Sequence, residues 1–306
     1  MEITVEWASQ QGWITQKTAA VYDFAFIKAL KSIPWQDWIN TPETFRIREE
    51  YLETYHHWLQ SSSLQKIRGL DAFPIRHLTN GTTQSFDEAY FEYRSRRLRI
   101  FRGEYAYHRR VFPHWKFIED EPLAADDFII VSAPFCSTGE VHPQTSHTLD
   151  EALKLNVPVI LDCAYIGTCA QIDFNADHPA ILSVCFSLTK GLGLGDIRSG
   201  IRYSRIDNQG SISQQNQYNH SVLCAAKIGL YMMKHFSVDH IPLKFRGSQL
   251  AFCKDLSLQA TPVMHIALGD QKWKSFEVDG LYNRVGIRNG VKAYYQGRTT
   301  PALNID

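Results

Sequence analysis

The chain has 306 residues, which is enough for one large domain or for two modest lobes. Apolar residues make up 44% of it and charged residues 21%, as in ordinary globular proteins. The 32 Lys and Arg residues balance the 32 Asp and Glu residues, and this balance argues against binding of nucleic acid through a broadly basic surface.

The sequence pattern favours neither a membrane span nor a secretory leader. No apolar run approaches the roughly 18 residues that cross a bilayer, and the first ten residues carry two Glu and no basic start. The cysteines are dispersed without a C-x-x-C pair, at positions 136, 163, 169, 185, 224 and 253. We therefore expect reduced thiols in a cytoplasmic protein that binds neither a membrane nor nucleic acid.

Two helices are predicted in the first third of the chain. The first covers residues 41–60, with Thr41 as its N-cap and Pro42 at the first helical position, and its aromatic residues recur at helical spacing. The serines at 61–63 end this helix. A turn-like stretch then opens a second helix, which is expected to extend to about residue 97.

Further along, short apolar strands alternate with helices. Strands are predicted at 127–131, 157–161, 181–186 and 200–205. Helices are predicted at 148–156 and 217–235. This alternation predicts a three-layer α/β/α fold with a mainly parallel sheet.

The tail from about residue 244 differs in pattern from the middle of the chain. Its candidate elements are a helix at 247–256 and strands at 263–268 and 282–287. We interpret it as part of a reduced α+β small domain. The predicted division is a large domain at 61–240, and a small domain with the aromatic-rich N-terminal segment at 1–60 and 241–306.

Polar residues gather directly after three of the predicted strands, at 132–139, 162–165 and 187–198. In open α/β sheets, ligands bind at the carboxyl ends of the strands. A fourth group, Gly81-Thr82-Thr83, opens a helix, and the free backbone N–H groups and dipole of a helix N-terminus suit a phosphate. The sequence therefore predicts a ligand site at this edge of the sheet.

Lys190 lies among small residues after a buried strand. A lysine in such a place can have a lowered pKa and can form a Schiff base with an aldehyde. Ser187 and Arg198 add a hydroxyl group and a guanidinium group, which both suit a phosphate. Taken alone, Lys190 also fits an ordinary solvated lysine in a Gly-rich loop.

Asp162 and Tyr165 follow the strand predicted at 157–161. An Asp at the end of a strand is often a loop former. It also suits pairing with a protonated pyridine nitrogen, the partner that a pyridoxal-phosphate (PLP) ring requires. Tyr165 can offer its hydroxyl group to the phenolate oxygen of such a ring.

The order of these motifs resembles fold-type I PLP-dependent enzymes of the aminotransferase class I/II group. It runs from Gly81-Thr82-Thr83 through Asp162-x-Ala-Tyr165 and Ser187-x-x-Lys190 to Arg198, over about residues 78–205. The resemblance implies PLP as cofactor and Lys190 as the catalytic lysine, which forms the internal aldimine and moves protons. It implies further that Asp162 pairs with the pyridinium nitrogen and that Tyr165 hydrogen-bonds the phenolate oxygen.

The same resemblance assigns the remaining site residues. The phosphate-binding residues would be Gly81, Thr82, Thr83, Ser187 and Arg198. An aromatic residue should stack on the ring, with Tyr105 preferred over Tyr107. The substrate carboxylate would bind Arg284, with Arg288 as second choice, although either also fits a surface arginine.

The sequence departs from the family at two places. Many members have Asn-Pro-x-Gly where this chain has Cys136-Ser137-Thr138-Gly139, so a group that touches the ring oxygen differs. The chain is also short for the family, so its small lobe must be reduced. Both departures leave room for PLP chemistry other than transamination.

The resemblance implies a PLP-dependent aminotransferase that acts on an amino acid as a homodimer with a shared site. The alternative enzyme is a non-transaminating one that carries out elimination, cyclisation, decarboxylation or oxidation of an amino acid. The alternative of another class is a PLP-binding regulatory protein without turnover. No metal site is expected, since the sequence has no H-E-x-x-H motif or Cys/His ladder.

Overall fold

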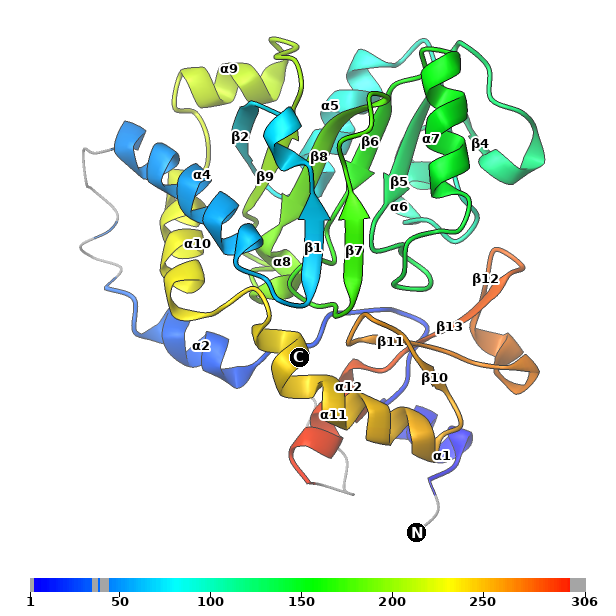
Figure 1. Ribbon diagram of the computed structural model, residues 1–306. Coiled ribbons are helices and arrows are strands. Elements are labelled where there is room, and N and C mark those ends of the chain that lie inside the picture. The colour runs from blue at the N-terminus through cyan, green and yellow to red at the C-terminus, as the bar shows by residue number, and fades with distance from the viewer. Residues whose placement is uncertain (1–2, 35–37, 39–43, 298–306) are drawn as a thin grey trace.

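The computed structural model describes residues 3–34, 38 and 44–297 and is built around a seven-stranded sheet (Figure 1). In spatial order, the strands are β2 (Ile75–Thr79), β9 (Gly200–Ser204), β8 (Ile181–Ser187), β6 (Val159–Asp162), β5 (Asp127–Ser132), β3 (Arg97–Ile100) and β4 (Trp115–Phe117). Strands β8, β6, β5, β3 and β4 are parallel, whereas β9 is antiparallel to both of its neighbours. The mainly parallel α/β fold predicted from the sequence is confirmed.

The interiors of the central strands are mainly apolar because both faces of the sheet are covered. Along β5, Phe128 and Ile130 belong to one buried cluster, and Ile129 and Val131 belong to another. Figure 1 shows α5 (Thr82–Glu92) and α6 (Tyr107–Val111) behind the sheet, with α4 (Thr44–Gln60) and α7 (Thr145–Lys154) in front. The two clusters fill the spaces between these layers.

Helix α4 confirms most of the first predicted helix, whose proposed cap, Thr41 and Pro42, lies outside the described residues. It packs on α10 (Leu223–His235) and on β2. The hydroxyl groups of its buried Tyr51 and of Ser199, next to β9, share a hydrogen bond with 2.6 Å between the two oxygen atoms. A two-stranded parallel sheet of β1 (Gln65–Arg68) and β7 (Ile172–Asn175) lies beside α4.

Several predicted helix boundaries differ from the structure. The helix predicted at 217–235 begins only at Leu223, as α10, because the chain turns at Asn219, whose φ is +54°. The residues before this turn form a separate helix, α9 (Ser211–Gln217). Helix α11 (His240–Asp255) begins seven residues before the predicted start, since Pro242 fits the first turn of a helix. The remaining short helices of this part are α8 (Leu188–Gly191), η1 (Leu70–Ala72) and η2 (Ile118–Asp120).

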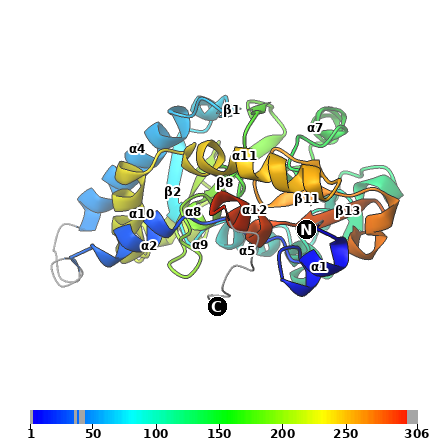
Figure 2. The same cartoon turned by 90° about the horizontal axis from the view of Figure 1, so that it is seen from below.

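A four-stranded antiparallel sheet lies below the large sheet in Figure 1. Its order is β10 (Gln259–Ala260), β11 (Ile266–Leu268), β13 (Tyr282–Gly286) and β12 (Glu277–Val278). The helical elements of this region are α1 (Val5–Gln10), α2 (Phe24–Lys31), α11, η3 (Gln271–Phe276) and α12 (Arg288–Tyr295). Figure 2, seen from below, shows α11 and α12 lying side by side across the end of the large sheet. The division into two domains at residues 60 and 240 stays a prediction.

Among the described residues, no helix is both long enough and apolar enough to cross a membrane.

Candidate active site

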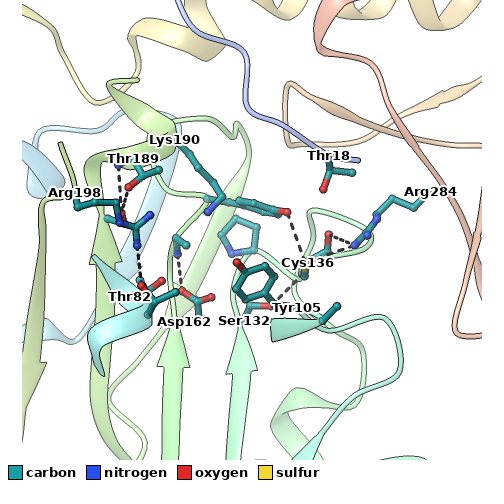
Figure 3. A pocket seen from close by; sticks show the side chains of 16 residues that line it. Thr18, Thr82, Tyr105, Ser132, Cys136, Asp162, Thr189, Lys190, Arg198 and Arg284 are labelled. Atoms are coloured by element: carbon teal, nitrogen blue, oxygen red, sulfur yellow. Dashed lines mark hydrogen bonds between the residues drawn. The ribbon is translucent and has the colours of Figure 1, made fainter. Parts of the chain in front are cut away.

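A cavity of about 290 Å³ lies where the carboxyl ends of β5, β6 and β8 meet the beginning of α5 and the small sheet (Figure 3). All of the site residues predicted from the sequence line it, apart from Gly81. They are Thr82, Thr83, Tyr105, Asp162, Tyr165, Ser187, Lys190, Arg198 and Arg284. The edge of the sheet therefore gathers residues from segments that are far apart in the sequence.

One side of the cavity suits an anion. Helix α5 begins at Thr82, and no side chain caps its first N–H groups, because its N-cap is Gly81. Gly81 has φ of +88°, and a Cβ atom there would lie 3.0 Å from Ser187 Oγ and 3.2 Å from Arg198 Nη2. Glycine therefore lets α5 approach these two side chains, and the exposed amides and the helix dipole favour a bound anion.

Arg198 completes the anion-binding side of the cavity. Its Nη2 atom donates a 2.7 Å hydrogen bond to Thr83 Oγ1, which holds the guanidinium group against the start of α5. Ser187 is fixed in turn, since its Oγ accepts from the Thr189 amide at 3.2 Å and donates to Thr189 Oγ1 at 2.8 Å. The two sequence-predicted phosphate ligands from the β8 side are thus held in place before a ligand binds.

Lys190 and Asp162 form the electrostatic centre of the cavity. Asp162 is the last residue of β6, and its carboxylate accepts a hydrogen bond from the Ala164 amide at 2.9 Å. Burial raises the pKa of Asp162 to about 6, although nearby Lys190 opposes this shift. Burial also lowers the pKa of Lys190, against the attraction of Asp162. Burial therefore favours a neutral, nucleophilic amine, while the Ala164 amide and the Thr82 side chain hydrogen-bond the carboxylate.

Tyr165 stands over Lys190 and reaches toward a thiol. Its ring centre is 5.4 Å from Lys190 Nζ, and its hydroxyl oxygen is 3.6 Å from Cys136 Sγ. The ring of buried His265 meets it edge-on at 5.0 Å. Burial lowers the pKa of His265 to about 3, so this imidazole is neutral. Tyr165 is therefore fixed in orientation while its hydroxyl group faces the cavity.

The structure separates the two aromatic candidates. Tyr105 lines the cavity and is 41% exposed. Tyr107 stacks on Tyr105 with 5.8 Å between the ring centres, and its hydroxyl group donates to Asp87 at 2.7 Å. The Tyr107 ring supports Tyr105 from outside and is not part of the cavity lining. Only Tyr105 is placed to touch a ligand.

Of the two arginine candidates for the substrate carboxylate, one lines this cavity and the other does not. Arg284, on β13, lines the cavity opposite Arg198, and its Nη1 atom donates to the Cys136 carbonyl at 3.3 Å and to Ser137 Oγ at 3.4 Å. Its Nε atom is buried and has no hydrogen-bond partner among the described residues. Arg288 starts α12 and lines a different hollow with Lys17. Arg284 is therefore the arginine that can meet a carboxylate in this cavity.

Comparisons with solved structures find the same architecture. An aminotransferase, AspB, from Helicobacter pylori matches with a TM-score of 0.59 and 11% identity, over 95% of this chain and 96% of that one. The PLP-bound C–S lyase from Staphylococcus hominis has a TM-score of 0.65 and 10% identity, over 91% of each chain. L-threonine-O-3-phosphate decarboxylase from Porphyromonas gingivalis has a TM-score of 0.58 and 14% identity, over 83% of this chain and 80% of that one.

The chain has the aminotransferase-like fold of fold-type I enzymes. No protein-family model matches the sequence, and no curated protein matches it. The three matched structures carry three different reactions, so this fold does not select one of them.

Sequence reasoning gave no individual role to several residues that line the cavity of this aminotransferase-like fold. Ser132, Pro134, Ala164 and Thr189 lie within the groups expected at the site edge, and Cys136 was noted as a departure from the family, whereas Thr18 and Ala106 lie outside all of these groups. Ser132 ends β5, at the carboxyl end of a strand, as expected for a ligand-site residue. Thr18 gave no such signal, because its segment reaches the cavity through a bridge between Thr15 and Gly286 on the small sheet.

Proposed function

We propose that the protein is a PLP-dependent enzyme that acts on an amino acid, with Lys190 as the residue that holds the cofactor. The observation that carries the proposal is the cavity itself. A half-buried lysine with a lowered pKa and a buried carboxylate face the same space, and an anion-binding helix end closes one side of it.

The residues present fit this cofactor. The first amides of α5, with Thr82, Thr83, Ser187 and Arg198, would hold its phosphate, and a Cβ atom at Gly81 would intrude on this cradle. Asp162 would pair with the protonated ring nitrogen, which relieves the cost of its burial. Tyr105 would lie against the ring, and Tyr165 would direct its hydroxyl group at the ring oxygen.

When bound, PLP supplies an electron sink for a carbanion at the substrate Cα atom. The residues of the chain do the rest. Asp162 keeps the ring nitrogen protonated, and Lys190 Nζ, as a neutral amine, accepts or returns the proton at Cα. Arg284 orients the substrate through its carboxylate. Asp162 is buried and Lys190 is half-buried, and this partial exclusion of water strengthens each of these interactions.

Among reactions, we propose aminotransfer first. The specific observation for the alternative is the Cys136 thiol, which is 3.6 Å from the Tyr165 hydroxyl oxygen where many members of the fold have an asparagine. This change favours elimination, cyclisation, decarboxylation or oxidation of an amino acid as the second candidate. A homodimer and a cytoplasmic setting are also proposed, and the reduced cysteines suit such a setting.

The test is a titration with PLP, monitored by absorbance at about 300 to 500 nm, where imines of PLP absorb. The wild-type protein should develop a visible band at one PLP per chain, and Lys190→Ala should not. Lys272→Ala removes an exposed lysine and should behave like the wild type. A wild-type protein that shows no band in PLP excess would rule the proposal out.

A further inference from the structure

Glu104 is a buried carboxylate beside the cavity that the proposed chemistry does not use. It lies in the loop between β3 and α6 and is only 2% exposed. It accepts hydrogen bonds from the Tyr105 amide at 2.9 Å, from the Ser132 amide at 3.0 Å and from Ser132 Oγ at 2.6 Å. Within the described part of the chain, no Lys, Arg or His forms an ion pair with it. A buried carboxylate with only neutral donors is costly to the fold.

Ser132 connects this carboxylate to the cavity. Glu104 itself is absent from the cavity lining, whereas Ser132 and Tyr105 belong to it. The Ser132 hydroxyl group donates to Glu104 Oε1 and accepts from the Cys136 amide at 3.1 Å. This serine oxygen therefore links the Glu104 carboxyl group to the cavity, whose lining includes Ser132 (Figure 3).

The surroundings of Glu104 favour the presence of both its protonated and its ionised form near neutral pH. Burial raises the pKa of Glu104 to about 7, and the charge of Asp162 on β6 adds to this shift. The three hydrogen bonds that Glu104 accepts lower its pKa and so oppose this shift. The other ionisable groups on this side are the Cys136 thiol, which feels Glu104, and Arg284, which contacts Cys136. No cation touches the carboxylate directly among the residues described.

We propose that Glu104 and Ser132 form a proton relay into the cavity, in addition to Lys190. Protonated Glu104 donates to Ser132 Oγ, which leaves the serine hydroxyl hydrogen free to point into the cavity. The carboxyl proton then moves to Ser132 Oγ as the serine proton moves to a basic atom of the ligand. One proton leaves Glu104 and one arrives at the ligand, without electron transfer, and the reverse sequence takes a proton back. The identity of the ligand rests on the proposed function.

The first readout is infrared spectroscopy of the protein without PLP, recorded as a difference between pH 6 and pH 8. Asp162, with a pKa of about 6, also titrates in this range, so the comparison is made in the Asp162→Asn background. A protonated carboxyl band that titrates near pH 7 should be present in that background and absent once Glu104→Gln is added. Asp239→Asn is the matched control, because Asp239 is also a buried carboxylate held by neutral donors, namely Ser62 Oγ, the Ser63 amide and Gln65 Nε2. This variant should keep the band. An Asp162→Asn protein without it contradicts the relay whether or not PLP binds.

The second readout is a pH jump across neutrality in the PLP-loaded protein, followed by the cofactor absorbance. The relay predicts a fast phase that Glu104→Gln loses, that Ser132→Ala slows on the order of 100-fold, and that Asp239→Asn keeps. Ser132→Thr keeps the hydroxyl group and should restore the rate. If Glu104→Gln fails to fold, the rates of the fast phase in Ser132→Ala and Ser132→Thr still test the relay.

The outcomes separate this inference from the proposed function. Wild-type protein that binds no PLP contradicts the proposed function, and the infrared titration then still tests Glu104. PLP-loaded Ser132→Ala with the wild-type rate contradicts the relay alone and leaves Glu104 as a structural link between two loops.

Discussion

At the scale of single residues, Asp162 shows how the fold prepares the site before any ligand arrives. Its carboxylate is buried and accepts one backbone hydrogen bond, and it ends a strand whose other three residues are apolar. Burial raises its pKa from 3.8 to about 6. Because this folded-state pKa lies above the unfolded value, the native state favours the protonated form, and ionisation works against the fold.

This shift predicts a pH dependence of stability for the protein without PLP. The stability due to protonated Asp162 is present below about pH 4 and is lost as pH rises through about 6. The free energy of unfolding of the wild type should therefore fall relative to that of Asp162→Asn, by about 3 kcal/mol at most between pH 4 and pH 7. Urea unfolding of both proteins at several pH values measures this difference in the free energy of unfolding. A constant difference would show that the pKa of Asp162 is not raised.

At the scale of elements, the start of α5 makes the anion-binding side and depends on one glycine. Gly81 combines φ of +88° with a close approach to Ser187 and Arg198. A residue with a Cβ atom costs about 1–3 kcal/mol in this backbone region alone, because φ of +88° with ψ of −176° is essentially restricted to glycine. We expect Gly81→Ala to lower the affinity for PLP about tenfold or more while it affects pyridoxal, which lacks the phosphate, much less.

Fluorescence titrations with PLP and with pyridoxal measure this preference. The control is Gly247→Ala in α11, where a Cβ atom would meet nothing within 4 Å and where alanine is the better helix former. This control should keep the affinity for PLP. An unchanged preference for PLP over pyridoxal in Gly81→Ala would remove α5 from the phosphate-binding role.

The sequence predicted the elements that local patterns encode and missed the contacts between distant segments. The strands β5, β6 and β8 were found because their apolar runs reflect burial on both faces, and the polar residues after them marked the site edge. Thr18 and the link from Glu104 to Ser132 were not found. Both depend on contacts between segments that are distant in sequence, which no local pattern encodes.

At the scale of the whole molecule, the open side of the cavity suggests a second copy of the chain. Tyr105 lines the cavity and is still 41% exposed, although proposed PLP chemistry needs a dry site. The N-terminal aromatic residues contribute less to this argument than the sequence suggested, since Trp13 and Phe26 are buried within their own chain. Phe24 is 43% exposed and is still available for an interface.

We therefore expect a homodimer whose sites are covered at the interface, with twofold symmetry as the commonest arrangement. Sedimentation velocity at micromolar concentration, with and without PLP, measures the mass of the loaded species. A monomer that carries one PLP per chain and converts an amino acid at that concentration would contradict this expectation.

The central claim is that Lys190 holds the cofactor, and one measurement tests it directly. The protein is incubated with PLP, reduced with borohydride, digested and analysed by peptide mass spectrometry. The account predicts a single stoichiometric pyridoxyl adduct on the peptide that contains Lys190, with none on exposed lysines such as Lys272. Stoichiometric labelling of another lysine, with Lys190 unmodified, would contradict it.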